Sequence, residues 1–229
     1  RQQAQTDLYK MVKIFADHDY EVTVYPTRAR LDCTRKVLED AGRFDLVVCC
    51  GGDGTLNEMV SGMMQRQDRR PMGYIPLGST NDLAVSLRLP TRVEEAALRA
   101  VTGNEFHMDV GTLNDRYFNY IAAFGAFTET SYATPQEIKN ALGHLAYILE
   151  GVKSLGKILP IHVKITADDE QFEEDYLFGA VTNTISLGGV LKLDPEKVLL
   201  DDGMYELLLV KNPTNALEAQ AMLLSLIHI

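Results

Sequence analysis

The chain has 229 residues, 46% of them hydrophobic and 24% charged, which is enough apolar material for one sizeable core or two modest domains. Its formal net charge of −10 argues against a nucleic-acid-binding protein, because such binding depends chiefly on neutralising phosphates. Three cysteines without framework spacing are typical of a reducing compartment, and no apolar run is long enough to cross a bilayer, so we expect a cytoplasmic protein without a transmembrane segment.

The first hundred residues alternate between helical and strand-like patterns. A helical opening places apolar residues at 8, 11, 12 and 15. Strands are predicted at 21–25, 45–50 and 71–78, and helices at 31–38, after Gly54, from about 79–82, and from 91 to 103. Strands that alternate with helices predict βαβ units, so we expect a doubly wound α/β domain over residues 1–104.

Beyond about residue 105 the pattern changes to alternating strands. Runs at 107–113 and 117–124 flank Asn114-Asp115, a hairpin signal, and further strands are predicted at 161–165, within 176–185 and at 204–210. One helix interrupts them: Thr134-Pro135-Gln136-Glu137 combines start signals, and an apolar stripe continues to Val152. We expect residues 105–229 to form an antiparallel β-sandwich.

The stretch CCGGDGTLNEMV, residues 49–60, has the pattern of a strand, a glycine turn and a helix start. Gly51, Gly52 and Gly54 allow backbone approaches that a Cβ would prevent. Free N–H groups at the start of a helix, together with its dipole, favour a phosphate there. The pattern is equally compatible with an ordinary tight turn in which Asp53 is a cap and no ligand binds, so the turn alone does not decide between the two.

A second glycine turn follows the next predicted strand, where Gly78 precedes Ser79-Thr80-Asn81-Asp82. Ligands of parallel α/β sheets bind at the carboxyl ends of the strands. Both glycine turns are expected at that end, which favours a ligand site between them.

Three segments together resemble the bacterial diacylglycerol kinase family of soluble lipid kinases. They are GGDGTLNE (51–58), PLGSTNDLA (76–84) and LLDDGMYELLLV (199–210), and their order and spacing match over essentially the whole chain. NAD kinases and phosphofructokinases have similar GGDGT turns, whereas the second segment is the lipid-kinase version. The resemblance implies an ATP- and Mg²⁺-dependent kinase that phosphorylates a hydroxyl of diacylglycerol, with ATP between an α/β domain and a β-sandwich.

The resemblance also implies the site residues. Asp53 would act in catalysis beside the metal-bound triphosphate, and the nucleotide contacts would be Thr27, Gly51, Gly52, Asp53, Gly54, Thr55, Leu56, Asn57 and Ser79. Asp202, with the backbone carbonyls of Leu199 and Met204, would hold a structural Mg²⁺, a cation that prefers oxygen ligands. No Walker A lysine follows Gly54, which argues against a P-loop NTPase.

Two pieces typical of the family are missing from the sequence. The family opens with a strand that ends in an NPxxG-type turn, and its general-base glutamate lies in a DGE segment; neither occurs here. We therefore interpret the chain as a fragment truncated at both ends, with the base expected beyond the C-terminal end.

Alternatives to the lipid kinase remain open from the sequence. An NAD kinase would use a soluble nicotinamide nucleotide as acceptor, and a nucleotide-binding module would carry out no transfer. The lipid could be diacylglycerol, phosphatidylglycerol or a sphingoid base, met at the inner face of the membrane, and a homodimer is a reasonable default. The acidic run 168–175 favours a solvated hairpin over a calcium site, and Gly188-Gly189 favours a bulge over a ligand approach.

Overall fold

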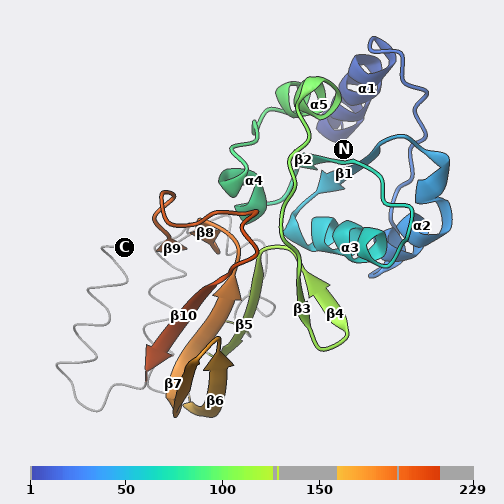
Figure 1. The fold of residues 1–229 in the computed structure, drawn as a ribbon. Helices are drawn as coiled ribbons and strands as arrows, with labels where there is room; N and C mark the ends of the chain where they lie inside the picture. Colours follow the sequence, from blue (N-terminus) through green and yellow to red (C-terminus); the bar gives the residue numbers. More distant parts are fainter. Residues whose placement is uncertain (1, 126–127, 129–158, 190, 212–229) are drawn as a thin grey trace.

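The computed structural model describes residues 2–125, 128, 159–189 and 191–211 (Figure 1). An α/β part comes first along the chain and an antiparallel part follows it. The helix predicted from 134 to 152 lies outside the described residues.

The α/β part contains two parallel strands and five α-helices. The helices are α1 (Gln2–Ala16), α2 (Asp32–Asp40), α3 (Asp53–Met64), α4 (Asp82–Ser86) and α5 (Val93–Thr102), with a 3₁₀ turn at Ala41–Arg43. The strands β1 (Val47–Gly51) and β2 (Met72–Pro76) pair in parallel, with Cys49 opposite Tyr74 and Cys50 opposite Ile75. The strand and helix signals of the sequence agree with these elements, apart from the run at 21–25.

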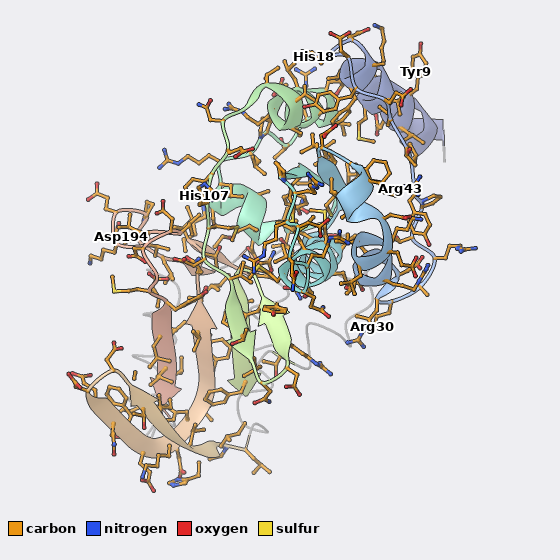
Figure 2. All side chains as sticks on the ribbon, turned by 45° about the vertical axis from the view of Figure 1, so that its right-hand side comes forward. Tyr9, His18, Arg30, Arg43, His107 and Asp194 are labelled. Atoms are coloured by element: carbon orange, nitrogen blue, oxygen red, sulfur yellow. The ribbon has the colours of Figure 1, made fainter. Side chains whose placement is uncertain are left out.

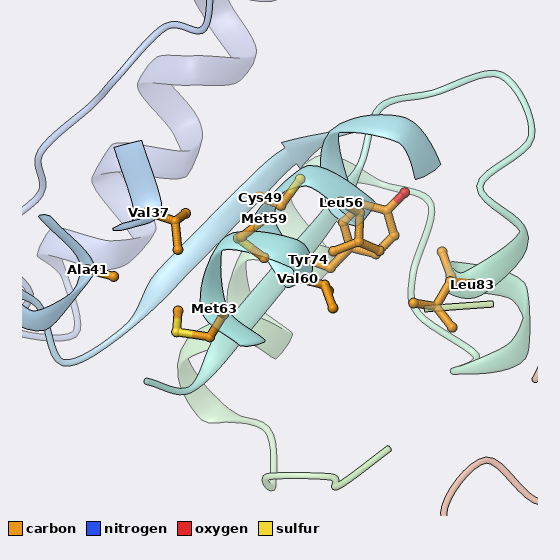
Figure 3. Packing of buried hydrophobic residues seen from close by; sticks show 10 residues of the cluster. Val37, Ala41, Cys49, Leu56, Met59, Val60, Met63, Tyr74 and Leu83 are labelled. Carbon is orange, nitrogen blue, oxygen red and sulfur yellow. The ribbon is translucent and has the colours of Figure 1, made fainter. Parts of the chain in front are cut away.

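Side chains that alternate along β1 and β2 divide the core into two layers. Cys49 and Tyr74 face α2 and α3, and Figure 3 shows them packed with Val37, Leu56 and other residues of those helices. Ile75 faces the other way, into a cluster with residues of α1 and α5. Helices therefore cover both faces of the strand pair, which confirms the doubly wound α/β arrangement.

The antiparallel part is organised around one long strand. Its strands are β3 (Gly111–Leu113), β4 (Arg116–Phe118), β5 (Ile121–Gly125), β6 (Ile161–Ala167), β7 (Glu170–Thr182), β8 (Ser186–Leu187), β9 (Leu191–Lys192) and β10 (Glu206–Lys211). β7 pairs with β6 along its first half and with β5 and β10 along its second half. β3–β4 forms the predicted hairpin at Asn114-Asp115, and the acidic run lies at the β6–β7 hairpin.

These strands confirm an antiparallel β part after the α/β part. Within the described residues they form one four-stranded sheet and two two-stranded ladders, so the facing second layer of a sandwich is not seen there. The last helix of the α/β part ends at Thr102 and β3 begins at Gly111. We propose that the chain divides into its two domains within this interval, near residue 104.

The strand predicted at 21–25 is wrong. Residues 20–29 follow an irregular path with no assigned strand, and the parallel sheet of the described residues contains β1 and β2 only. Val22 and Val24 alternate with polar residues as in a strand, but their side chains are 40% and 50% exposed. A strand requires a neighbour that takes its backbone hydrogen bonds, and the described part of the chain provides none beside this run.

Gly62, where α3 crosses α2, offers a test of this packing. A Cβ on Gly62 would lie 2.9 Å from the Thr34 carbonyl oxygen and 2.9 Å from the Val37 Cβ. We expect Gly62→Ala to lower the free energy of unfolding by about 1–3 kcal/mol, although alanine is the better helix former, because the two helices must move apart. Urea unfolding measures this, with Ser61→Ala on the same helix as the control. A Gly62→Ala protein as stable as the parent would contradict the close crossing.

Candidate functional site

The glycine turn after β1 presents the N-terminus of α3. Gly52 is the N-cap residue in an extended conformation, and α3 begins at Asp53. Helix geometry leaves the N–H groups of residues 53–55 without an acceptor inside the helix. The next amide, of Leu56, donates to the Gly52 carbonyl at 3.1 Å. A Cβ on Gly54 would meet no protein atom within 4 Å, so this side of the turn has room for a ligand.

The second glycine turn lies against the first. The Leu77 amide continues the parallel ladder by donating to the Gly51 carbonyl at 2.8 Å. A Cβ on Gly78 would lie 2.6 Å from the Gly52 Cα, so the two turns touch backbone to backbone. This contact places both turns at the carboxyl end of the strand pair, as the sequence indicates.

Asn81 fixes the shape of the second turn. It adopts a left-handed conformation with φ of 55°. Its side-chain oxygen accepts hydrogen bonds from the Gly78 amide (2.9 Å) and the Tyr74 hydroxyl (3.1 Å), and its Nδ2 donates to the Gly78 carbonyl (2.7 Å). Asparagine is among the few residues that tolerate this backbone conformation while bonding to nearby backbone groups.

Asp53 connects the starts of α3 and α4. Its carboxylate accepts hydrogen bonds from the amides of Asp82 at 3.2 Å and, more loosely, Leu83 at 3.5 Å. Burial raises the pKa of Asp53 above its ordinary range, and these N–H groups oppose that rise. Asp53 therefore caps the start of the neighbouring helix α4, and it lies at the first position of α3, directly after the glycine turn.

Asp82 connects the α/β part to the antiparallel part. Its side chain is buried; one oxygen accepts from the Ser186 hydroxyl (2.6 Å) and the Gly189 amide (3.0 Å), and the other from the Gly188 amide (2.8 Å). Burial raises the pKa of Asp82, the three donors oppose the rise, and the nearby Asp53 adds to it. A buried carboxylate with three donors is a specific junction between the two parts.

The remaining predicted nucleotide contacts occupy different surroundings. Ser79 is exposed at the second turn and Thr27 is exposed on the segment before α2, whereas Thr55, at the first turn, is half-buried. The Leu56 side chain lies in the core. The Leu56 backbone amide is also bonded within the helix. Neither the side chain nor the amide of Leu56 is therefore available to a ligand. Asn57 donates from Nδ2 to the Tyr117 carbonyl at 3.4 Å, which connects α3 to the β3–β4 hairpin.

The predicted magnesium ligands lie on the exposed segment before β10. Asp202 accepts a hydrogen bond from the Met204 amide at 3.0 Å, and the Gly203 amide donates to Asp109 at 2.6 Å. Leu199 and Met204 expose their side chains, at 55% and 65%. Within the described ranges no three His, Cys, Asp or Glu side chains gather as metal ligands; the predicted site would need only one carboxylate with two carbonyl oxygens.

Sequence reasoning missed three residues that shape this site: Asn81, Asp82 and Glu58. All three belong to the quoted motifs. They are polar residues near the starts of predicted helices, and this position could have identified them from the sequence. The bulge predicted at Gly188-Gly189 is wrong, because both glycines have positive φ in the turn between β8 and β9 and donate to Asp82.

Comparisons with known proteins agree with the geometry. Residues 1–113 match the diacylglycerol kinase catalytic domain. The chain is 37% identical over 206 residues to a diacylglycerol kinase of Bacillus subtilis, covering 89% of this chain and 68% of that protein. It is 34% identical over 193 residues to a diacylglycerol kinase of Staphylococcus saprophyticus, covering 84% of this chain and 63% of that protein. The chain belongs to the diacylglycerol kinase family.

A solved member of the diacylglycerol kinase family shares the fold. The crystal structure of a diacylglycerol kinase from Bacillus anthracis matches with a TM-score of 0.76 and 27% identity, over 96% of this chain and 72% of that chain. Membership of the diacylglycerol kinase family confirms the assignment made from the three segments. Among the described residues, no helix combines the length and the apolar character that a membrane span requires.

The Asp82 junction can be tested by removing one acceptor. Asp82→Asn keeps the shape of the side chain but turns an NH₂ group toward a donor, leaving an N–H or hydroxyl of the β8–β9 turn unsatisfied. We expect the free energy of unfolding to fall by about 1–3 kcal/mol. Denaturant unfolding measures the change, with Asp169→Asn in the exposed β6–β7 turn as the matched control. Equal losses in the two variants would contradict a specific role for Asp82.

Proposed function

We propose that this chain is the nucleotide-binding part of an ATP-dependent lipid kinase, which transfers the γ-phosphoryl group of ATP to a hydroxyl of diacylglycerol and yields phosphatidic acid. The observation that carries the proposal is the contact of two glycine turns at the carboxyl end of β1 and β2, with Asp53 at their mouth. This geometry supports the proposal because it would place backbone N–H groups around a triphosphate.

The phosphates of ATP would lie on the start of α3. Residues 51–55 and Ser79 would supply backbone N–H groups and hydroxyls, and the open side of Gly54 would let the phosphates approach. Phosphoryl transfer depends mainly on positioning and on donors aimed at the developing charge, which fixed backbone groups provide. Asn57 would act through the hairpin that it holds, and Leu56 through packing.

Asp53 would serve the metal-bound triphosphate. Mg²⁺ would supply neutralisation of the phosphate charge. The amides of Asp82 and Leu83 orient the Asp53 carboxylate before any ligand arrives. Burial raises the pKa of this carboxyl, and a neighbouring cation would favour its ionised form, so the site suits a metal complex better than a free anion.

A second Mg²⁺, with a structural role, would be held on the segment before β10. Asp202 is exposed beside the positive-φ Gly203, and the carbonyl groups of Leu199 and Met204 belong to the same short segment. One carboxylate and two carbonyls are oxygen donors of the kind a hard cation prefers.

The acceptor and its location follow from the same proposal. The lipid hydroxyl would be met at the inner, cytoplasmic face of the membrane, and a homodimer would be compatible with it. This sequence contains no DGE segment, so the general base would come from outside it. Diacylglycerol is the acceptor named for the relatives from Bacillus subtilis and Staphylococcus saprophyticus.

The proposal is tested by transfer of labelled γ-phosphate from Mg-ATP in the complete reading frame that contains this sequence. Diacylglycerol, phosphatidylglycerol, a sphingoid base and NAD form the acceptor panel. We expect diacylglycerol to be labelled, and Asp53→Ala to reduce the rate by roughly 100-fold or more, because an electrostatic group at the transferred phosphate is lost. Asp169→Ala should leave the rate unchanged. Labelling of NAD alone would show a nucleotide kinase, and ATP binding without any transfer would show a binding module.

The structural Mg²⁺ can be tested without catalysis. A cation that binds the folded state alone stabilises it, by about 2.7 kcal/mol at a hundredfold excess over Kd. We expect Mg²⁺ to raise the melting temperature of the parent and of Asp201→Ala, and to have no such effect on Asp202→Ala. If the shift in melting temperature is lost in the Asp201 variant and kept in the Asp202 variant, then Asp201 is the Mg²⁺ ligand and the assignment to Asp202 is wrong.

A further inference from the structure

The segment between α1 and α2 carries Thr27 but has no backbone ladder of its own. Residues 20–29 have no assigned helix or strand, and Arg30 lies at the periphery of the α/β part (Figure 2). The segment ends at Leu31, which adopts the left-handed conformation with φ of 64°. Backbone hydrogen bonds from Asp32 to Ala29 (3.2 Å) and from Arg35 to Leu31 (3.0 Å) connect the end of the loop 25–31 to α2, and side-chain hydrogen bonds hold the rest of it.

Asp32 gives this loop its internal shape. The Asp32 carboxylate accepts hydrogen bonds from the Arg28 amide at 2.9 Å and from the Tyr25 hydroxyl at 3.1 Å. Arg35 bonds both Asp32 (2.6 Å) and the Tyr25 hydroxyl (2.9 Å). The Arg35 bond holds the pKa of Asp32 below its ordinary range, so this carboxylate is charged at neutral pH. The loop is a closed unit, but none of these bonds fixes it to α3.

Glu58 fixes the loop to α3. Its Oε1 accepts a hydrogen bond from the Leu31 amide at 2.9 Å, and its backbone carbonyl accepts one from the Thr34 hydroxyl at 2.8 Å. Glu58 lies on the same helix as the glycine turn, about one turn of helix beyond its first residues. The loop 25–31 and the glycine turn proposed to bind phosphate are therefore both attached to the same helix, α3.

The conformation of Leu31 has to be imposed by its surroundings, and the Glu58 contact is one of its bonds. A non-glycine residue in the left-handed region costs of order 1 kcal/mol and persists only where its surroundings impose it. The Leu31 side chain is 59% exposed, so packing contributes little to holding it. The Leu31 amide lies at the start of α2 and needs an acceptor, which its own side chain cannot supply. Glu58 supplies that acceptor.

We propose that Glu58 is a positioning residue for the nucleotide: by binding the Leu31 amide, its carboxylate holds the Thr27 loop at a fixed place beside the start of α3. This inference rests on the proposed function, in which Thr27 contacts ATP. This role of Glu58 differs from direct binding of the nucleotide complex. It requires an acceptor oxygen within hydrogen-bond distance of the Leu31 amide, and it does not require a negative charge.

Three substitutions of Glu58 separate the effect of side-chain length from the effect of its negative charge. Glu58→Gln keeps the length and an acceptor oxygen, Glu58→Asp keeps the charge and shortens the side chain by one methylene, and Glu58→Ala removes both. We expect Mg-ATP to bind about tenfold more weakly to the Ala and Asp variants, corresponding to loss of one hydrogen bond to a charged group. The Gln variant should bind within about threefold of the parent. Glu95→Ala, an exposed glutamate on α5, is the matched control and should bind as the parent does.

Two measurements on the complete reading frame are needed. Calorimetric titration gives the affinity for Mg-ATP, and hydrogen exchange gives the protection of the Leu31 amide. KM for ATP should rise in the Asp and Ala variants with kcat at saturating ATP nearly unchanged, and their Leu31 amide should exchange faster. If Glu58→Ala does not fold, Glu58→Asp carries the test.

The outcomes separate this inference from the function on which it rests. Failure of the parent to bind Mg-ATP would overturn the proposed function and this inference with it. Parent-like affinity in a variant whose Leu31 amide has lost protection would overturn the positioning role alone. Equal losses in Glu58→Gln and Glu58→Ala would also overturn it, since they would show that the charge of Glu58 acts directly on the ligand complex.

Discussion

The architecture of the site depends on the backbone contact between Gly52 and Gly78. A Cβ at residue 78 would come within 2.6 Å of the Gly52 Cα, so the two turns can meet in this way only where residue 78 lacks a side chain, and a Cβ on Gly52 would be tight at 3.1 Å from the Gly78 Cα. The contact brings the start of α3 within reach of the start of α4, and Asp53 joins them through the amides of Asp82 and Leu83. The glycines are therefore needed for assembly of the site as well as for access to it.

Two carboxylates, the half-buried Asp53 and the buried Asp82, then extend this contact to the antiparallel part. Burial raises the pKa of both Asp53 and Asp82, and the nearby Asp53 raises the pKa of Asp82 further. Each is compensated by backbone donors, and Asp82 has the Ser186 hydroxyl as well. Because an unpaired buried donor is expensive, the β8–β9 turn has one favourable position against α4. The geometry between the two parts is thus set at the site itself.

Much of the fold could be predicted from the sequence, because hydrophobic periodicity reports local structure directly. The periodic residues of α1 and the glycine turn before α3 gave correct elements, and the alternation in 161–165 gave β6. The same signal failed at 21–25, since alternation says nothing about a neighbouring strand. Membership of the family was accessible from three motifs, whereas Asp82 and Glu58 were not assigned, because their partners, Ser186 and Leu31, lie far away in sequence.

The length of the GGDGTLNE motif has a physical explanation in the helix that it begins. Its first five residues form the turn and the free N–H groups of the first helical turn. Successive residues of a helix point about 100° apart. The last three therefore face three directions: Leu56 into the core, Asn57 to the β3–β4 hairpin and Glu58 to the start of α2. One short helix start thus presents N–H groups at its tip, while its sides contact the core, the β3–β4 hairpin and the start of α2.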